Sequence, residues 1–227
     1  MAAEPKTMTE PKKITLSMMR SSLYSAVVCD ALDQAGYRNQ SPRLDFRPYT
    51  GAGVLVGRAK TTLWVDMAHD EPDPYALELA AVDSCKPDDV FVAATAGSTR
   101  SAIWGELLTT AASRCGCVGA IVDGGVRDIA KVRAMNFPVF ARSASPYDSQ
   151  NRQRVVNVDV RVEIGGVQIE PGDLVVADED GVVVIPRAAE EDVIRRAWEK
   201  VHAENRVRDA IREGMSATAA YEKYGVL

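Results

Sequence analysis

The sequence predicts an α/β fold, in which a parallel or mixed sheet carries helices on its faces and is followed by a second β-layer and a helical arm. Three observations support this prediction. Strand and helix patterns alternate up to Phe140, as they do around a parallel or mixed sheet. From Val155 onward, short apolar strands separated by glycine- and proline-containing turns replace that alternation. After Pro186 the chain is highly charged and has a helical pattern.

The first half is divided by glycines, prolines and a change of hydrophobic period. A helix is predicted over 17–35, where Gly36 ends it, and a loop with Pro42 and Pro48 follows. The next segments show strand or helix patterns in turn. The expected strands are 51–57, 59–65, 90–95, 120–122 and 137–140, and the expected helices are 75–84, 102–115 and 129–135.

The second half predicts strands over 155–164, 167–169, 174–177 and 182–185, with good turn sequences between them. We therefore divide the chain into a flexible tail (1–13), an α/β domain (14–186) and a C-terminal helical arm (187–227). The arm has too little apolar surface for an independent domain. We expect it either to reach a neighbouring subunit or to fold back on its own.

Composition limits the classes of function. The 227 residues are 46% hydrophobic and 26% charged, which fits one globular domain with its own core. The formal net charge of −5 argues against a nucleic-acid partner, which would normally need a basic face. The polar stretch 1–13 has no apolar region typical of a signal peptide or membrane span, so we expect a cytoplasmic protein without a membrane partner.

The four cysteines favour free thiols in a reducing compartment. Cys115 and Cys117 form a CxC pair, but the chain has only two histidines with which to complete a zinc site. Cys29 and Cys85 lie in apolar stretches, where a thiol usually acts as a small hydrophobe. We therefore expect buried free thiols.

Residues 122–128 are the clearest candidate for a site. A predicted buried strand runs into Gly124 and Gly125, which permit a close backbone approach, and then presents Arg127 and Asp128. In α/β sheets, ligands bind beyond the carboxyl ends of strands. Arginine offers a planar fork for a carboxylate, and aspartate offers a hard oxygen ligand for Mg²⁺ or Mn²⁺. The alternative is a structural ion pair, or a helix N-cap at Asp128.

A second candidate is the stretch 104–108, near the start of the helix predicted over 102–115. Free backbone N–H groups and the helix dipole make such a position a natural carboxylate site. Glu106 could hold metal-bound water there, or it could merely interact favourably with the dipole.

Taken together, the two stretches resemble a known family. Twenty residues separate Glu106 from Arg127, and this spacing resembles the acidic-x20-Arg-Asp signature of the class II 4-hydroxy-4-methyl-2-oxoglutarate aldolases. That family shares its fold with the regulator-of-ribonuclease-activity-A (RraA) proteins. The resemblance implies an RraA-like α/β/β sandwich of the swivelling type with a C-terminal helical arm. It extends over 16–186 through further short motifs, which are 30–32, 138–142, 165–167, 171–173 and 180–186.

The resemblance also implies roles for the matching residues. Asp128 would be the direct ligand of Mg²⁺ or Mn²⁺, and Glu106 would act through ordered water. Arg127 would bind the pyruvyl end of a small oxo-acid substrate, and the backbone at Gly105, Leu107 and Leu108 would hold its carboxylate. A homotrimer, or a hexamer of two trimers, is implied as well. A further glutamate is expected from the arm of an adjacent subunit, and Glu204 is our choice.

These roles predict a metal-dependent pyruvate aldolase. Breaking a C–C bond next to a 2-oxo acid leaves a pyruvate enolate, whose negative oxygen needs a cation, and the metal with Arg127 would supply it. Oxaloacetate decarboxylation gives the same enolate and is an expected second activity. The tract 145–152 differs from the lysine-bearing segment of the characterised aldolases, and Glu106 stands where aspartate is commoner. The alternatives are a non-catalytic RraA-like binding or regulatory protein, and a lyase or hydrolase acting on a different oxo or sugar acid.

Overall fold

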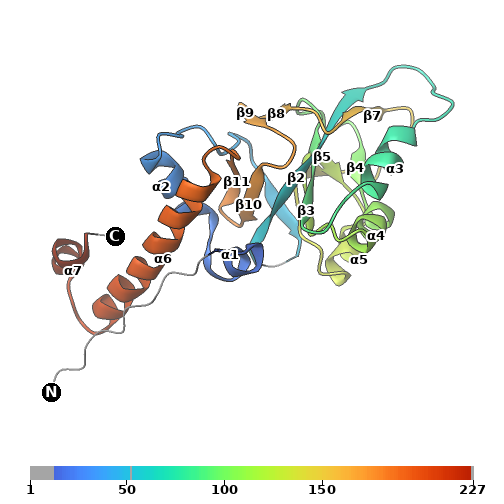
Figure 1. Cartoon of the computed structure of the whole chain (residues 1–227). Helices are drawn as coiled ribbons and strands as arrows, with labels where there is room; N and C mark the ends of the chain where they lie inside the picture. Colours follow the sequence, from blue (N-terminus) through green and yellow to red (C-terminus); the bar gives the residue numbers. More distant parts are fainter. Residues whose placement is uncertain (1–12, 52, 226–227) are drawn as a thin grey trace.

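A nine-stranded sheet runs through the computed structural model, which describes residues 13–51 and 53–225 (Figure 1). Its strands are β1 (Arg47–Thr50), β2 (Leu55–Asp66), β3 (Asp89–Ala94), β4 (Ala102–Trp104), β5 (Gly119–Val126), β6 (Val139–Ala144), β7 (Gln153–Val158), β10 (Leu174–Asp178) and β11 (Gly181–Ile185). The order is β1-β6-β5-β3-β2-β10-β11, with β4 beside β5 and β7 beside β2. The central strands β2, β3, β5 and β6 are parallel, as the alternating pattern predicts.

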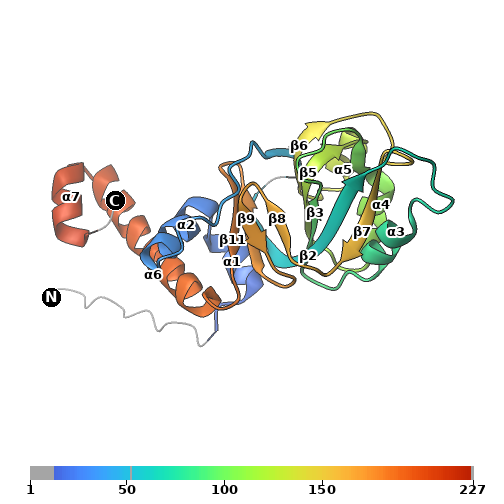
Figure 2. The ribbon, with the colours of Figure 1, turned by 90° about the horizontal axis from the view of Figure 1, so that it is seen from above.

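Two different layers cover the faces of the parallel strands. Helices α3 (Ala76–Asp83), α4 (Glu106–Arg114) and α5 (Ile129–Ala134) pack on one face, and the hairpin of β8 (Val162–Ile164) and β9 (Val167–Ile169) packs on the other (Figure 2). Alternate residues of β3 face opposite layers, because side chains alternate along a strand. Phe91 lies against the helices, whereas Val90 and Val92 lie against the hairpin. The expected α/β/β sandwich is therefore confirmed.

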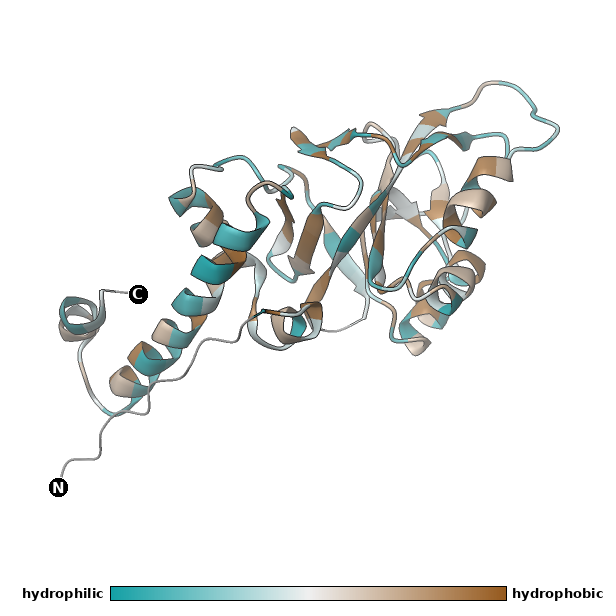
Figure 3. Cartoon of the chain, viewed as in Figure 1, coloured by the Kyte–Doolittle hydropathy of each residue, from teal (hydrophilic) through white to brown (hydrophobic). Residues whose placement is uncertain are grey.

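The remaining helices lie on the side of β10 and β11. They are α1 (Leu16–Ser22), α2 (Ser25–Gln34), α6 (Glu190–Arg212) and α7 (Ala217–Tyr224). Figure 1 shows α6 running away from the sheet, with α7 at its far end. The buried side chains of α1, α2 and α6 meet the inner residues of β10 and β11 in one cluster. Figure 3 shows the mixed hydropathy of α6, with apolar residues interspersed among polar ones.

The first part of the arm packs on its own chain. Val193, Ile194, Ala197 and Val201 of α6 are buried in that cluster. The spacing of three and four residues gives α6 one apolar face, and this face docks on α2 and β11. Of the two alternatives for the arm, folding back on its own subunit holds for these turns.

The single helix predicted over 17–35 is wrong, because the chain divides into α1 and α2. Leu23 and Tyr24 have extended backbones between the two helices. The carboxylate of Asp178, at the end of β10, accepts hydrogen bonds from the backbone N–H of Ser25 (2.7 Å) and from its Oγ (2.6 Å). A new helix therefore begins at Ser25, capped by a residue distant in the sequence.

Other boundaries differ because strand pairing overrides local pattern. The helix predicted over 102–115 begins only at Glu106, since Ala102 and Trp104 pair with β5. The loop predicted around Pro48 contains β1, where proline is tolerated because β1 is an edge strand. The strand predicted over 51–57 begins at Leu55 and continues unbroken into the next one as β2, and the strand predicted over 155–164 is divided into β7 and β8.

Other sequence-based expectations concern the tail, membranes and cysteines. The tail predicted over 1–13 lies, apart from Lys13, outside the described residues. Within the described part of the chain, no helix is long and apolar enough to cross a membrane. The four cysteines are free, with Cys85 and Cys117 buried and Cys29 and Cys115 half-buried.

Candidate functional site

Strand β4 explains the spacing between Glu106 and Arg127. β4 runs parallel to β5, with Trp104 opposite Val126, so the chains leaving the two strands emerge side by side. Glu106 follows one strand end and Arg127 follows the other. The backbone N–H of Arg127 donates to the carbonyl of Trp104 (2.9 Å) and fixes the pairing at this point. Glu106 and Arg127 are therefore brought side by side at the carboxyl edge of the sheet, where α/β proteins bind ligands.

Asp128 connects the two stretches directly. It occupies the N-cap position of α5 in a left-handed conformation (φ 56°), yet its side chain makes no capping hydrogen bond to that helix. Its Oδ2 instead accepts a hydrogen bond from the backbone N–H of Glu106 (3.2 Å), the first residue of α4. A simple N-cap of its own helix is therefore excluded for Asp128. A non-glycine residue held in this conformation is uncommon and marks a functional candidate.

Gly105 is required by this contact. A Cβ added at Gly105 would lie 2.8 Å from Oδ2 of Asp128 and 3.1 Å from Cγ of Arg127. A side chain at this position would therefore displace the carboxylate of Asp128 and crowd Arg127. The first backbone N–H groups of α4, at Leu107 and Leu108, have no intrahelical acceptor and belong to the same helix start.

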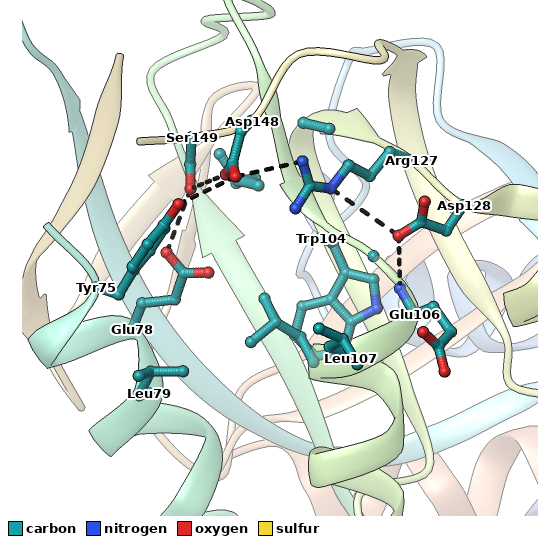
Figure 4. Close-up of a pocket in the computed structure, with 14 residues that line it drawn as sticks. Tyr75, Glu78, Leu79, Trp104, Glu106, Leu107, Arg127, Asp128, Asp148 and Ser149 are labelled. Carbon is teal, nitrogen blue, oxygen red and sulfur yellow. Dashed lines mark hydrogen bonds and ion pairs between the residues drawn. The ribbon is translucent and has the colours of Figure 1, made fainter. Parts of the chain in front are cut away.

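A cavity of about 280 Å³ opens beside these groups (Figure 4). Gly105, Glu106, Leu107, Leu108, Arg127 and Asp128 all line it, so the structure brings together every site residue predicted from the sequence except Glu204. Trp104 also lines this cavity. It is buried, packs against Phe91 with ring centroids 4.8 Å apart, and donates from Nε1 to Thr109 (2.9 Å). The rigid indole supports the start of α4.

Arg127 reaches across the cavity. Its Nε lies 3.9 Å from Oδ2 of Asp128, which is too long for a strong hydrogen bond, and its Nη1 lies 3.5 Å from Oδ2 of Asp148. About one third of its side chain is exposed. Figure 4 shows the guanidinium between the two carboxylates. The pairing with Asp128 is loose enough to leave N–H donors of Arg127 available to a ligand.

The opposite wall was missed by the sequence reasoning. It consists of Tyr75 and Glu78 at the start of α3, and Asp148 and Ser149 in the loop after β6. The hydroxyl of Tyr75 donates to Oδ2 of Asp148 (3.0 Å), and Oγ of Ser149 lies 3.5 Å from Oε2 of Glu78. We call these four residues the acidic wall, and the set of Gly105, Glu106, Leu107, Leu108, Arg127 and Asp128 the motif wall.

One sequence signal could have found Glu78. It shares a helix face with Ala81 and Val82, three and four positions later, and all three are buried. Leu77 and Leu79 are 45% and 52% exposed, so α3 turns a glutamate inward and two leucines outward. A glutamate on the buried face of a helix departs from ordinary patterning and indicates a specific role.

The acidic wall holds two carboxyl groups with opposite pKa shifts. Burial, together with the nearby charge of Asp148, raises the pKa of Glu78 from 4.5 to about 7. Burial also acts to raise the pKa of Asp148, but hydrogen bonds from Tyr75 and from the backbone N–H of Gln150, with the charge of Arg127, outweigh it and lower that pKa. Asp148 is therefore the carboxylate that stays ionised, and Glu78 is the one that readily takes a proton.

The donor set suits a hydrated divalent ion. Among residues 13–51 and 53–225, no group of three or more His, Cys, Asp or Glu side chains is arranged to hold a metal. Asp128 has a partly exposed carboxylate, while the carboxylate of Glu106 points away from it toward Lys131 (Oε2–Nζ 4.0 Å) (Figure 4). One direct carboxylate completed by water fits Mg²⁺, which keeps several of its waters in protein sites.

Glu204 lies elsewhere in this chain. It is on α6, its side chain is 14% exposed, and it accepts a hydrogen bond from the hydroxyl of Tyr24 on the α2 side. Lys200, one turn earlier, lies 3.7 Å from it. Within one chain, Glu204 is therefore an internal contact of the helices around β10 and β11, apart from the cavity.

Comparison with known proteins agrees with this geometry. A 36% identical relative from Halalkalibacterium halodurans, named as a candidate 4-hydroxy-4-methyl-2-oxoglutarate aldolase, aligns over 86% of this chain and 87% of its own. A protein of the same name from Aromatoleum aromaticum is 34% identical over 70% of this chain and 94% of its own. The crystal structure of Streptomyces coelicolor RraAS2, an unusual member of the RNase ES inhibitor RraA protein family, superimposes with a TM-score of 0.74 at 29% identity, covering 89% of this chain and 99% of that one. The model of the RraA-like family, described as Aldolase/RraA, matches residues 25–184, and the chain belongs to this family.

Proposed function

We propose that this protein is a divalent-metal-dependent lyase that cleaves a C–C bond next to the pyruvyl group of a short oxo acid. Oxaloacetate decarboxylation is proposed as a second activity. The observation that supports this most is the meeting of Arg127, Asp128 and the first turn of α4 at one cavity. The names of the two aldolase relatives support the same reaction class.

The motif wall accounts for recognition of the oxo-acid end. The N–H groups of Leu107 and Leu108 form an anion site, because they are free of intrahelical acceptors and the helix dipole favours negative charge. Arg127 lies beside them and can present two parallel N–H donors to a carboxylate or to the neighbouring oxo group. A substrate held at both points is fixed in orientation before bond cleavage.

The proposed cleavage depends on stabilising the negative charge that forms on the pyruvyl fragment. Retro-aldol cleavage breaks the bond between C3 and C4: the C4 hydroxyl gives its proton to water and becomes a carbonyl, and the electron pair remains on the pyruvyl fragment as an enolate. The enolate then takes up a proton from water at C3 to give pyruvate. Arg127 stabilises the negative oxygen that forms, in a cavity where it is already in place. Asp128 would hold Mg²⁺ or Mn²⁺ directly. Glu106 would hold it through water, which requires its carboxylate to turn from Lys131 toward Asp128. When bound, the ion would supply further positive charge.

Replacing Asp128 tests this function. We expect Asp128→Ala to abolish metal-dependent release of pyruvate from 4-hydroxy-2-oxo acids and oxaloacetate, because the ion loses its one direct protein ligand. Pyruvate release should be measured with and without Mg²⁺ and Mn²⁺, and Mn²⁺ binding should be measured separately. Asp83→Asn, an exposed carboxylate of α3 outside the cavity, is the matched control. Wild-type rates in Asp128→Ala at modest Mg²⁺ would disprove the assignment.

Similarity to RraAS2 supports a second candidate, a non-catalytic regulatory protein. The same assay separates the two. A regulator would release no pyruvate from any substrate of the panel, whatever metal is added.

We also propose that the subunits assemble as a trimer, or as a hexamer of two trimers, with Glu204 of one subunit serving its neighbour's cavity. Such a role requires Glu204 to give up its contact with Tyr24. Removing everything after Pro186 is unsuitable as a test, because it deletes the buried residues of α6.

Mixing inactive variants is a cleaner test of the shared site. We expect partial recovery when Asp128→Ala subunits are combined with Glu204→Gln subunits, since each mixed oligomer then contains some intact sites. The glutamine keeps an oxygen that can accept from Tyr24. Light scattering gives the mass, and tagged subunits show whether mixing has occurred. Demonstrated mixed oligomers without recovery would contradict a role for Glu204 in the neighbouring site.

A further inference from the structure

The acidic wall is placed to contact the part of the substrate that the motif wall does not reach. If the oxo-acid end binds between Arg127 and the start of α4, the rest of a short substrate extends across the cavity toward α3. Figure 4 shows Tyr75, Glu78, Asp148 and Ser149 on that side, opposite Asp128. The cavity has a volume of about 280 Å³, so a short substrate can contact both walls.

The charges lining the cavity are unbalanced. Four carboxyl groups line it, on Glu78, Glu106, Asp128 and Asp148. Among the described lining residues, Arg127 is the one cation, and it already lies 3.5 Å from Asp148. A carboxylate at the far end of a substrate would therefore meet Glu78 and Asp148 without a cation of its own, and like charges held close together are strongly unfavourable.

The hydrogen-bonding groups of the acidic wall suit hydroxyl groups. Asp148 is ionised and acts only as an acceptor, while Tyr75 has its O–H directed to Asp148 and keeps its oxygen free to accept. Glu78 is 5% exposed, and within residues 13–51 and 53–225 its one hydrogen-bond partner is Ser149, at a long 3.5 Å. It therefore has capacity left, as an acceptor when ionised and as a donor when protonated. A hydroxyl can both donate and accept, and so it can satisfy these groups.

We propose that, among 4-hydroxy-2-oxo acids, the site selects those whose group beyond C4 is hydroxylated and uncharged, and that Glu78 and Asp148 reject a carboxylate at that position. This inference rests on the proposed lyase function and specifies its substrate class. Glu78 and Asp148 are then specificity-determining residues, whereas the residues of the motif wall carry out the bond cleavage. The proton affinity of Glu78 agrees with this division, since burial and the nearby negative charge of Asp148 together raise its pKa to about 7.

Two substrates of the same carbon skeleton isolate the remote end. 4,5-Dihydroxy-2-oxopentanoate and 4-hydroxy-2-oxoglutarate differ only in carrying a hydroxymethyl group or a carboxylate on C4. Cleavage of the first gives pyruvate and glycolaldehyde, and cleavage of the second gives pyruvate and glyoxylate. With Mg²⁺ present, we expect kcat/KM for the dihydroxy acid to exceed that for the dicarboxylate by at least about tenfold.

Isosteric variants identify the residues responsible. Glu78→Gln combined with Asp148→Asn removes both charges while keeping side-chain size, and we expect the ratio of the two kcat/KM values to fall to about one. Asp83→Asn, on the exposed side of α3, should leave the ratio unchanged. An unchanged ratio in the double variant, or a wild-type enzyme that prefers the dicarboxylate, overturns the inference.

Failure of the lyase function would be visible separately. If neither compound yields pyruvate, the proposed reaction is wrong, but calorimetric titration of the same two compounds still compares their binding. Tighter binding of the dihydroxy acid then supports the selection by the acidic wall. Equal or tighter binding of the dicarboxylate overturns it.

Discussion

The two walls of the cavity are built in different ways. The motif wall comes from the ends of two adjacent parallel strands, and its geometry depends on the backbone: a glycine without a Cβ, a left-handed aspartate and the first turn of a helix. The acidic wall comes from a helix and a loop that meet through side chains, and its hydrogen bonds join Tyr75, Asp148, Ser149 and Glu78. The first wall is adapted to a fixed reaction centre, whereas the second can change with the substrate while the sheet stays the same.

Among variants that keep Asp128, Arg127→Lys should have the largest effect on the rate, because Arg127 reaches both walls. A lysine ammonium is a point charge and cannot reproduce a planar fork between Asp148 and a bound carboxylate. We expect kcat/KM for pyruvate release to fall about 100-fold, equivalent to ~2.7 kcal/mol. Arg133→Lys on α5, whose guanidinium donates to the carbonyl of Tyr49, is the matched control. Equal loss in both variants would mean that charge geometry at Arg127 is not the cause.

Gly105→Ala should disturb the motif wall alone. The added methyl group must displace Oδ2 of Asp128 or Cγ of Arg127, and small displacements of reacting groups are costly. We expect about a tenfold fall in kcat/KM with the substrate preference retained. Gly214→Ala has nothing within 4 Å of its added Cβ but is strained by its φ of +107°, so it controls for general destabilisation without a clash at the cavity. A changed ratio between the two C4-matched substrates would show that the walls are not independent.

Glu78→Gln should change the pH dependence of the free energy of unfolding, which tests the acidic wall without a rate measurement. In the folded chain the pKa of Glu78 is raised from 4.5 to about 7, so the folded state binds more protons than the unfolded state between these values. The contribution of Glu78 to the free energy of unfolding is therefore fully present below about pH 4.5 and is lost as the pH rises to about 7. Glutamine cannot ionise and escapes this loss, so its advantage over wild type should grow between pH 5 and pH 8, by at most about 3 kcal/mol.

Urea unfolding at the two pH values measures this difference. Asp83→Asn, on the same helix and exposed, should show a difference that does not grow with pH in this way. If Glu78→Gln and wild type keep the same separation at pH 5 and pH 8, Glu78 ionises as freely as a carboxyl group in water, and the acidic wall carries no electrostatic conflict.

The sequence predicted one wall and missed the other for physical reasons. Arg127 and Asp128 follow a strand with an obvious apolar pattern, so their place at the sheet edge could be predicted. The register of β4 on β5, which sets Glu106 beside them, could not be predicted. β4 has only three residues, too few for a strand pattern, and the sequence there favours a helix. Asp148 and Glu78 meet only after α3 and the loop before β7 have packed together, and no local pattern encodes that contact.

The same distinction holds for the fold. The alternation of buried strands and helices predicted the α/β/β layers, since each segment carries its own hydrophobic period. The break before α2 was missed because it depends on Asp178, whose carboxylate arrives from the other end of the chain. The hydrophobic period of a segment predicts a helix or a strand, whereas contacts with residues distant in the sequence determine where that helix or strand ends.

Strand β2 has a consequence for synthesis of the protein. Leu55–Arg58 pair on one side with β10, whose residues 174–177 are translated long after β2. Until those residues leave the ribosome, this edge of β2 is an unpaired apolar strand in the nascent chain. The part of the sheet that contains β2 therefore cannot complete its folding before β10 has been translated. The sheet is closed late, and the growing polypeptide is exposed to aggregation or to chaperones until β10 has been made.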